Sequence, residues 1–281
     1  MINEELLNDF KKYLKKKNLT NNTITAYTGS VRLFFSLFQD ITPEDMQKYK
    51  TYLISHYKPS TTNQRIYAMN HFSRFLSETS NEDILLISSY RLPSVKVQQK
   101  TFLDTIISNE DYELLKRKLK EEKNYFWYFI VRFLAATGAR VSELIQIKAE
   151  HLTLGYLDLY SKGGKVRRIY LPDSLCEEAL EWCRGRGIVS GFLFLNRNGH
   201  LITPRGINFQ LKSLAKRYGI NPDTVYPHSF RHRFAKNFLA CFNDISLLAD
   251  LMGHESIETT RIYLTRSSQE QQQMLDEIIT W

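Results

Sequence analysis

The segment HSFRHRFAKNFLACFNDISLLADLMGHESIETTRIY, which runs from His228 to Tyr263, is the most informative part of this 281-residue chain. It also contains Arg231 and His254, and the upstream stretch ATGAR ends at Arg140. Two arginines, two histidines and a tyrosine are the side chains needed to attack a phosphodiester without a metal ion. The segment therefore predicts a site for phosphoryl transfer.

Phosphoryl-transfer chemistry explains why these residue types belong together. The transition state spreads negative charge over its equatorial oxygens, and a guanidinium group matches that geometry with two parallel hydrogen bonds. A tyrosine hydroxyl has an unperturbed pKa of about 10, so it needs neighbours that accept its proton or stabilise the product. Histidine suits that role. We therefore expect two arginines to clamp one phosphate while histidines assist the tyrosine.

The spacing places these residues at helix ends. His228 precedes Arg231 by three residues, so at the start of a helix both side chains point to the same side. Gly253 suits the end of one helix, and Ser256 suits the beginning of the next. Tyr263 is then expected late in that short second helix.

Three separate motifs resemble those of the tyrosine recombinases, most closely the Xer and phage-integrase branch. ATGARVSELIQI is similar to the family's first-arginine motif, HSFRHRFA to its His-x-x-Arg motif, and LMGHESIETTRIYL to its closing histidine and nucleophile motif. LTNNTITAY resembles the beginning of the family's DNA-clamp helices. The resemblance covers nearly the whole chain. It implies a mainly α fold with a small β-sheet or hairpin, arranged as a two-domain DNA clamp of a helical core-binding domain and a catalytic domain.

The resemblance also implies a role for each residue of the set. Tyr263 would be the nucleophile that forms a 3′-phosphotyrosyl link to DNA and frees a 5′-hydroxyl. Arg140 and Arg231 would hold the scissile phosphate. His228 would transfer a proton with the tyrosine, and His254 would donate a hydrogen bond to a non-bridging oxygen. Such a protein is a site-specific DNA recombinase for integration, excision, inversion or dimer resolution, and it needs no metal or other cofactor.

The family takes its general acid for the leaving 5′-oxygen from a lysine on a β-hairpin. LDLYSKGGKVRRIYLP fits such a hairpin, because apolar residues alternate on both sides of a Gly-Gly turn. Lys162 matches the family's position just before the turn glycine. Lys165 competes for the role, although it is more simply interpreted, with Arg167 and Arg168, as phosphate-contacting charge.

Three further positions near the motifs need an interpretation. Glu143, one helical turn after Arg140, either orients the site, as the resemblance implies, or is a surface carboxylate in an ordinary i, i+3 pair. Arg233 stands where relatives usually carry a small hydroxyl residue, a departure that concerns DNA contacts rather than the chemistry. His232 is interpreted as a structural or helix-surface histidine.

Charge and length agree with a two-domain DNA-binding protein. The chain has 38 Lys and Arg against 30 Asp and Glu, a net charge of +8, and such an excess favours binding to the DNA backbone. SSYRLPSVKVQQK combines proline, small polar and basic residues without helical periodicity, which predicts a linker. We expect a helical core-binding (SAM-like) domain at 1–88, a linker at 89–100, and a catalytic domain at 101–281 that ends in a coupling helix.

Hydrophobic periodicity predicts helices on both sides of the linker. Before the linker, Thr20 and Thr42 suit helix starts. After it, helices are expected at about 108–122, 125–137 and 141–148, ahead of the hairpin. A later helix at 203–218 carries basic residues typical of an element that faces a DNA groove, namely Arg205, Lys212, Lys216 and Arg217. The apolar stripes before the linker include Leu7, Phe10 and Leu14, then Ile24, Val31 and Phe34, then Tyr67, Met69, Phe72 and Phe75.

An apolar stripe near the end of the chain predicts a terminal helix that follows the tyrosine. In the family this tail docks on a neighbouring protomer and couples four subunits, whereas packing against its own domain would produce the same stripe. The resemblance thus implies a homo-tetramer on double-stranded DNA with an inverted-repeat recombination site, with a partner recombinase as a further option. The stripe consists of Met274, Leu275, Ile278, Ile279 and Trp281.

Cysteine spacing and hydropathy limit the remaining classes of protein. Cys176, Cys183 and Cys241 form no Cys-x-x-Cys pair, which argues against a structural metal or a disulfide framework. No apolar run approaches ~20 residues, and the amino terminus is polar, so we expect a cytoplasmic protein without a membrane partner. Two alternatives to a recombinase stay open: a type IB topoisomerase-like protein that relaxes DNA, and a non-catalytic DNA-binding regulator.

Overall fold

The chain divides into two compact units, Met1–Gln99 and Lys100–Trp281, and each has its own apolar core. Within the described part of the chain, helices dominate and one antiparallel pair of strands occurs, so the mainly α fold class with a small hairpin is confirmed. No helix among these residues is long and apolar enough to cross a membrane. The computed structural model describes residues 4–79, 90–96, 106–160, 166–254, 256–264, 272 and 275–279.

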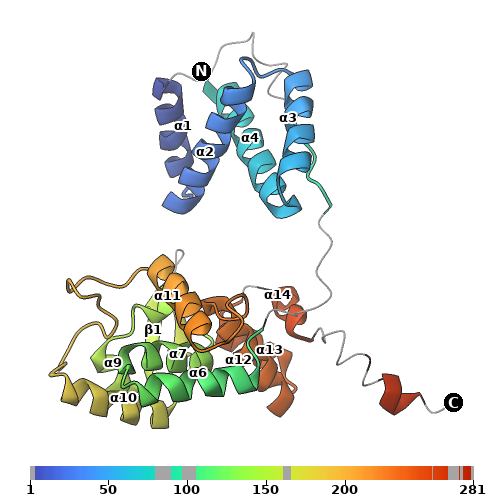
Figure 1. Ribbon diagram of the computed structural model, residues 1–281. Helices are drawn as coiled ribbons and strands as arrows, with labels where there is room; N and C mark the ends of the chain where they lie inside the picture. The colour runs from blue at the N-terminus through green and yellow to red at the C-terminus, as the bar shows by residue number, and fades with distance from the viewer. Residues whose placement is uncertain are drawn as a thin grey trace. The chain divides into compact units, whose positions relative to one another are not determined.

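The described residues of the N-terminal unit form four helices (Figure 1). Thr20 caps the second helix by accepting a hydrogen bond from Thr23 N at 3.3 Å, and Thr42 caps the third by accepting from Asp45 N at 3.0 Å. Both predicted helix starts are therefore confirmed. The helices are α1 (Glu4–Lys16), α2 (Asn21–Leu37), α3 (Pro43–His56) and α4 (Pro59–Thr79).

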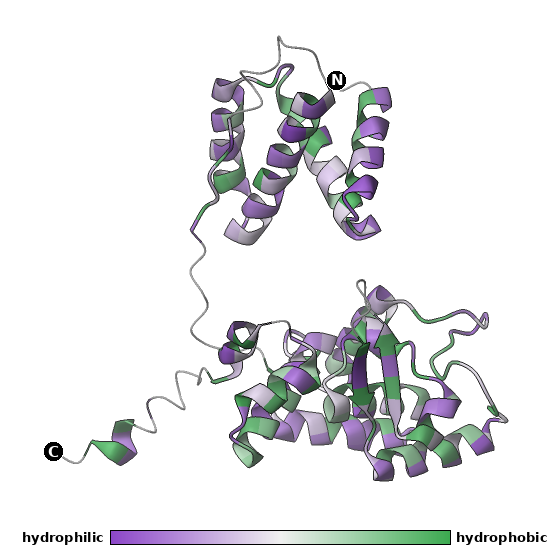
Figure 2. Cartoon of the chain, turned by 180° about the vertical axis from the view of Figure 1, so that it is seen from behind, coloured by the Kyte–Doolittle hydropathy of each residue, from purple (hydrophilic) through white to green (hydrophobic). Residues whose placement is uncertain are grey.

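Aromatic residues fill the core between these helices. Phe10 and Phe72 are fully buried, and their rings meet edge to face with centroids 4.9 Å apart. Tyr67 was predicted in the same stripe but is 48% exposed. The buried residues Ile66 and Met69 mark the core-facing side of α4, and Tyr67 lies about 100° away from Ile66 around the helix. Figure 2 shows hydrophobic and hydrophilic positions alternating around the helices.

Helices surround one hairpin in the described part of the C-terminal unit (Figure 1). The strongly apolar helix α7 packs against α6, α10 and α12 and so forms the centre of this core. The elements are α6 (Asn109–Glu121), α7 (Tyr125–Thr137), α8 (Val141–Leu144), α9 (Ala149–Leu154), β1 (Tyr156–Tyr160), β2 (Val166–Tyr170), α10 (Asp173–Gly185), α11 (Pro204–Arg217), α12 (Pro227–Cys241), α13 (Ile245–Met252), α14 (Ile257–Arg261) and the 3-10 turn η2 (Ile262–Leu264).

The helix predicted at 141–148 is wrong in length, because only the four residues of α8 are helical. The following backbone pairs with a segment that is distant in sequence. Leu193 N donates to Ile147 O at 3.0 Å, and Ala149 N donates to Gly191 O at 2.9 Å. These hydrogen bonds hold the stretch after α8 in an extended form, and a new helix, α9, begins behind it.

The two strands of the predicted hairpin are confirmed, with Leu159 of β1 opposite Arg167 of β2. The turn that carries Lys162 and Lys165 lies outside the described residues. Of the terminal stripe, Leu275, Ile278 and Ile279 are exposed by about half, at 50%, 57% and 46%. The other two members, Met274 and Trp281, are outside the described residues.

Candidate active site

Arg231, in the first turns of α12, is the most deeply buried charge of the site, with 1% of its surface exposed. Its Nη1 donates to Gly138 O at 2.5 Å, and its Nη2 donates to Met252 O at 2.7 Å and contacts His254 Nε2 at 2.9 Å. Burial, together with the charge of Arg140, lowers the pKa of Arg231 to about 10. Backbone carbonyls therefore fix this guanidinium in place while it remains a cation at neutral pH.

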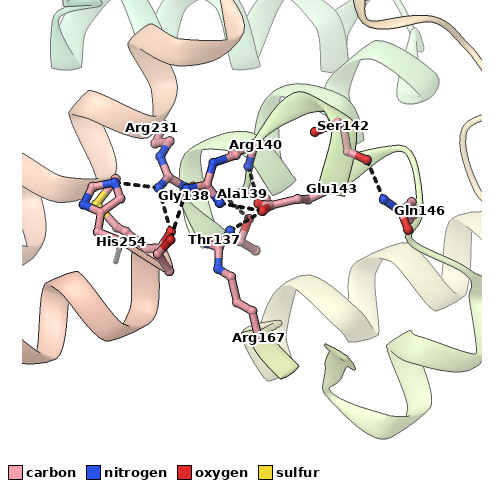
Figure 3. Close-up of polar contacts among 12 residues, drawn as sticks. Thr137, Gly138, Ala139, Arg140, Ser142, Glu143, Gln146, Arg167, Arg231 and His254 are labelled. Atoms are coloured by element: carbon pink, nitrogen blue, oxygen red, sulfur yellow. Dashed lines mark hydrogen bonds and ion pairs between the residues drawn. The ribbon is translucent and has the colours of Figure 1, made fainter. Parts of the chain in front are cut away.

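Arg140 lies at the start of α8 beside this cluster (Figure 3). Its Nη1 donates to Glu143 Oε1 at 2.8 Å, and its Nη2 donates to Gly253 O at 3.1 Å. The side chain is 44% exposed. It can thus reach a group that arrives from solvent.

Two glycines supply carbonyls to these arginines. Gly138 ends α7 and Gly253 ends α13, both in the left-handed region with φ of 59° and 60°. A Cβ on Gly138 would overlap the ring of Phe234. The glycine of the ATGAR motif is therefore required both by its backbone angle and by close packing, and its position fixes the carbonyl that holds Arg231.

Glu143 is buried, with 8% of its surface exposed, so the surface-carboxylate alternative is wrong. One carboxylate oxygen accepts a hydrogen bond from Arg140 N at 2.7 Å, and the other pairs with both Arg140 and Arg167. Burial alone would raise the pKa of this carboxyl. The hydrogen bond from Arg140 N and the charges of Arg167 and Arg140 outweigh burial and lower it.

His254 connects Arg231 to Thr260 of α14. Because arginine can only donate, His254 Nε2 accepts from Arg231, and Nδ1 then carries the proton and donates to Thr260 Oγ1 at 2.8 Å. Burial and the charges of Arg231 and Arg140 lower the pKa of His254 to about 4. Thr260 is fully buried and was missed by the sequence analysis, since a threonine in a helix carries no distinctive pattern.

Tyr263 lies in η2, directly after α14, rather than inside that helix as predicted. Only 4% of its surface is exposed. Its ring stacks on the ring of His254, with centroids 6.2 Å apart and planes 10° from parallel. Burial raises the pKa of Tyr263, and the charge of Arg231 opposes that rise. In this arrangement the phenol is sheltered and protonated.

Two histidine rings of α12 extend the cluster toward Tyr263. His228 lies on the exposed side, and its ring centroid is 4.3 Å from that of His232. His232 is 7% exposed, and its ring lies 5.2 Å from that of Tyr263. Loss of solvent and the nearby Arg231 lower the pKa of His228. The helix-surface interpretation of His232 is therefore wrong, whereas the structural one fits.

The remaining basic residues of the motifs differ in environment. Arg233 packs over the ring of Tyr112, with its guanidinium carbon 4.0 Å from the ring centroid, so it binds an aromatic residue of α6. Arg168 donates to Asp158 on the neighbouring strand at 2.7 Å. Among the described residues, no group of three or more His, Cys, Asp and Glu side chains could hold a metal ion.

The fold and the cluster together define a class of protein: a mainly helical, two-unit protein in which arginines, histidines and a buried tyrosine converge on one site. Residues 105–270 match the model of the phage integrase family, and residues 7–79 match the phage integrase N-terminal SAM-like domain. The chain belongs to the phage integrase family. It is a tyrosine-type, Xer-like site-specific recombinase that cuts and rejoins DNA, so the predicted family and enzyme class are confirmed.

Curated relatives match along most of their length. The tyrosine recombinase XerA of Pyrococcus furiosus is 29% identical over 269 residues, which cover 93% of this chain and 90% of that protein. The tyrosine recombinase XerD of Staphylococcus haemolyticus is 28% identical over 291 residues, which cover 98% of both. No large part of either relative is thus missing from the match.

Solved structures share the fold. The XerA recombinase crystal structure matches with a TM-score of 0.54 and 23% identity and covers 99% of both chains. XerH site-specific recombinase, in a post-cleavage complex with a palindromic difH substrate, matches with a TM-score of 0.73 and 20% identity, over 98% of this chain and 84% of that one. The arrangement of helices and hairpin is therefore that of known recombinases.

Proposed function

We propose that Tyr263 is the nucleophile of this recombinase and that it forms a 3′-phosphotyrosyl link to DNA. The observation that carries the proposal is the chain of contacts from Arg231 to His254 to Tyr263, at 2.9 Å between nitrogens and then by ring stacking. It brings a phosphate-binding group and a phenol to the same place. The phenol oxygen attacks the phosphorus, the bond from phosphorus to the 5′-oxygen breaks, and a free 5′-hydroxyl leaves.

Arg140 and Arg231 hold the scissile phosphate in this proposal. Carbonyls already fix Arg231, so its fork needs little rearrangement when a phosphate arrives. Arg140 is open to solvent over 44% of its side chain and supplies the second cation. Both stabilise the negative charge that develops on the non-bridging oxygens.

The histidines divide two tasks between them. His254 donates a hydrogen bond from Nε2 to a non-bridging oxygen, so a proton must occupy the nitrogen that accepts from Arg231 in the free protein. A phosphate anion favours that proton, because a nearby negative charge raises the pKa of an imidazole. His228, neutral near pH 7 because its pKa is lowered, accepts the proton of Tyr263.

Lys162 is the proposed general acid that protonates the leaving 5′-oxygen, and Lys165 is the alternative. The support is the position of both lysines in the hairpin between two strands that the structure describes. The phosphotyrosyl link preserves the energy of the broken bond, so rejoining needs neither a nucleotide nor another cofactor.

The proposed partner is double-stranded DNA with an inverted-repeat site, bound by a homo-tetramer in the cytoplasm, with a partner recombinase as an option. We assign 1–88 to DNA-clamp helices, 89–100 to a linker whose Leu92 packs into the core of the N-terminal unit, and 101–281 to catalysis and subunit coupling. The half-exposed Leu275 and Ile278 support a tail that docks on another protomer. Similar folds occur in XerH bound to difH and in a lambda integrase dimer bound to a core site.

A trapping assay tests the nucleophile. Duplexes selected from a random pool are nicked near the centre, so that the cleaved strand diffuses away, and the products are separated on a denaturing gel without added metal. The native chain should give a slow-migrating protein–DNA adduct. Tyr263→Phe should bind the same duplexes and give none, whereas the control Tyr125→Phe, at a partly exposed tyrosine of α7, should behave like the native chain. An adduct with Tyr263→Phe would refute the assignment.

A further inference from the structure

Arg167 is a cation of β2 that has no part in the steps above. Its side chain is only 13% exposed. One guanidinium nitrogen pairs with Glu143 (Figure 3). Nη2 donates to Leu251 O at 3.1 Å. This guanidinium is both largely buried and paired with a carboxylate, so it does not fit the phosphate-contacting role predicted from the sequence. Its protein partners suggest a different role.

Arg167 and Arg140 share a single carboxylate oxygen, Oε1 of Glu143. The other oxygen of Glu143 accepts from the backbone of Arg140, so the carboxylate is fixed at the beginning of α8. Without Arg167, the carboxylate would have Arg140 as its one cationic partner, and the two would form an ordinary i, i+3 pair that can swing toward solvent. Arg167 thus fixes the carboxylate with which Arg140 pairs.

The end of α13 gathers three arginines. Carbonyls at a helix C-terminus lack partners within the helix and carry partial negative charge, so they attract cations. Three consecutive carbonyls each accept one hydrogen bond from a different arginine. The pairs are Leu251 with Arg167, Met252 with Arg231, and Gly253 with Arg140.

Gly253 and Arg167 also fit against each other. A Cβ on Gly253 would overlap Cδ and Nε of Arg167, so the stem of the arginine occupies the space that the missing side chain leaves. Contacts to α8 and to the end of α13 therefore fix Arg167 from two sides. The hairpin and these two helices meet at this one side chain.

We propose that Arg167 is a positioning residue that holds Glu143, and through it Arg140, in the geometry that binds the scissile phosphate. The proposal rests on the function proposed for Arg140. It assigns Arg167 no contact with the reacting atoms. Substitution of Arg167 should therefore affect DNA cleavage in the same way as substitution of Arg140, but less strongly. The effect should differ from that of losing a general acid or the hairpin structure.

A substrate with a neutral methylphosphonate at the scissile position tests this role, because it lacks the charge that Arg140 neutralises. In the trapping assay with the ordinary phosphate, Arg167→Gln should be slowed about 100-fold, the effect of a misplaced catalytic group. With the methylphosphonate, the cleavage rate of Arg167→Gln should come within a few-fold of the native rate, and so should that of Arg140→Gln. The double variant should be no slower than Arg140→Gln alone, because both changes remove the same interaction.

Arg132→Gln is the matched control, since Arg132 is also largely buried, with 23% of its side chain exposed. This residue of α7 pairs with Glu178 of α10 at 3.1 Å. It should cleave both substrates at the native rate. Thermal unfolding of each variant shows whether it is folded. If Arg167→Gln is not folded, Arg167→Lys replaces it, with about a 10-fold loss on phosphate expected because one ammonium cannot reproduce the fork.

Three results would each overturn the role of Arg167: an equal loss of cleavage rate on both substrates, no loss of rate, or additive losses of rate in the double variant. If the native chain forms no adduct with either substrate, the proposed function fails and this inference fails with it. If the native chain cleaves but Arg140→Gln is unaffected, the phosphate clamp itself is wrong. These three failures give different patterns of adducts on the same gel.

Discussion

The two units of the chain contrast in what they bury. In the N-terminal unit, the buried polar residues that the structure describes are all hydroxyl residues. The C-terminal unit buries Glu143, Arg231 and His232 as well. The hydroxyl residues of the N-terminal unit are Thr28, Ser30, Thr62 and Ser73.

The contrast shows which unit gives up stability for chemistry. A buried charge is unfavourable unless hydrogen bonds and opposite charges compensate it, and an apolar core of the same volume is at least as stable. The N-terminal unit follows that rule with aromatic rings packed edge to face. The C-terminal unit departs from it at one place, where carbonyls of Gly138 and Met252 hold Arg231. Buried charge in this protein therefore coincides with the proposed active site.

Arg231→Lys should have the largest effect of the changes that test this contrast. A lysine keeps the charge but cannot donate to both Gly138 O and Met252 O and still offer a fork to phosphate. We expect adduct formation to slow about 1000-fold, the loss typical of a removed transition-state donor. Single-turnover trapping kinetics measure it. In the N-terminal unit, Arg32→Lys, at an exposed ion pair with Glu4, should change the rate less than 2-fold by the same reasoning. A similar rate for both variants would contradict the contrast.

Phe72→Ala should weaken only the N-terminal unit. Removal of a fully buried phenyl ring leaves a cavity and costs about 4 kcal/mol. Because each unit has its own core, calorimetry should show one transition at a lower temperature and one that stays in place. Phe133→Ala, at a fully buried ring of α7, is the matched change in the other core and should shift the other transition. If each variant shifted both transitions, the units would not be independent.

The sequence predicted the helices well where the signals are local. The caps Thr20 and Thr42 and the helices near 108–122 and 125–137 depend on short-range hydrogen bonds and apolar periodicity, and all are present. The helix predicted at 141–148 failed, because its end is set by pairing with backbone near Gly191, which no local pattern reveals.

The candidate site was predictable as a set of side chains but not as an arrangement. Arg140, Arg231, His254 and Tyr263 belong to motifs, and the structure places the four in one connected cluster. Their anchors are mostly backbone carbonyls, which have no signature in a sequence. The spacing of Glu143 is the same on a surface as in a site, so the contact with a distant strand was needed to separate the two.

Acid should reveal the buried histidine of the C-terminal unit. Burial lowers the pKa of His232 to about 4, with the nearby His228 and Arg231 adding to the effect. Between pH ~6.5 and ~4 the unfolded chain binds a proton here that the folded chain does not, so stability falls as the pH falls. The expected loss is about 3 kcal/mol. Denaturation by urea at several pH values measures it. His232→Gln should remove its share of this dependence and leave the share of His254, whose pKa is also lowered to about 4. His56→Gln, at an exposed histidine of α3, should leave the dependence as in the native chain.

The smallest effects are expected for alanine substitutions at two glycines within the C-terminal unit. Gly155 and Gly253 end α9 and α13 with φ of 76° and 60°, so alanine at either position should cost about 1 kcal/mol of backbone strain. A Cβ on Gly155 meets nothing within 4 Å, whereas one on Gly253 displaces Arg167. Chemical denaturation should therefore give a loss of about 1 kcal/mol for Gly155→Ala, which comes from strain alone. Gly253→Ala should lose at least as much, because it has the same strain and also displaces Arg167.

The trapping rate then separates the two variants. Gly155→Ala should cleave at the native rate, because its strain stays local. Gly253→Ala should be slowed about 10-fold, since the displaced Arg167 loosens the carboxylate that Arg140 shares with it. Equal rates would mean that the end of α13 tolerates an altered arginine cluster, and that charge is buried there for stability rather than for the geometry of the phosphate site.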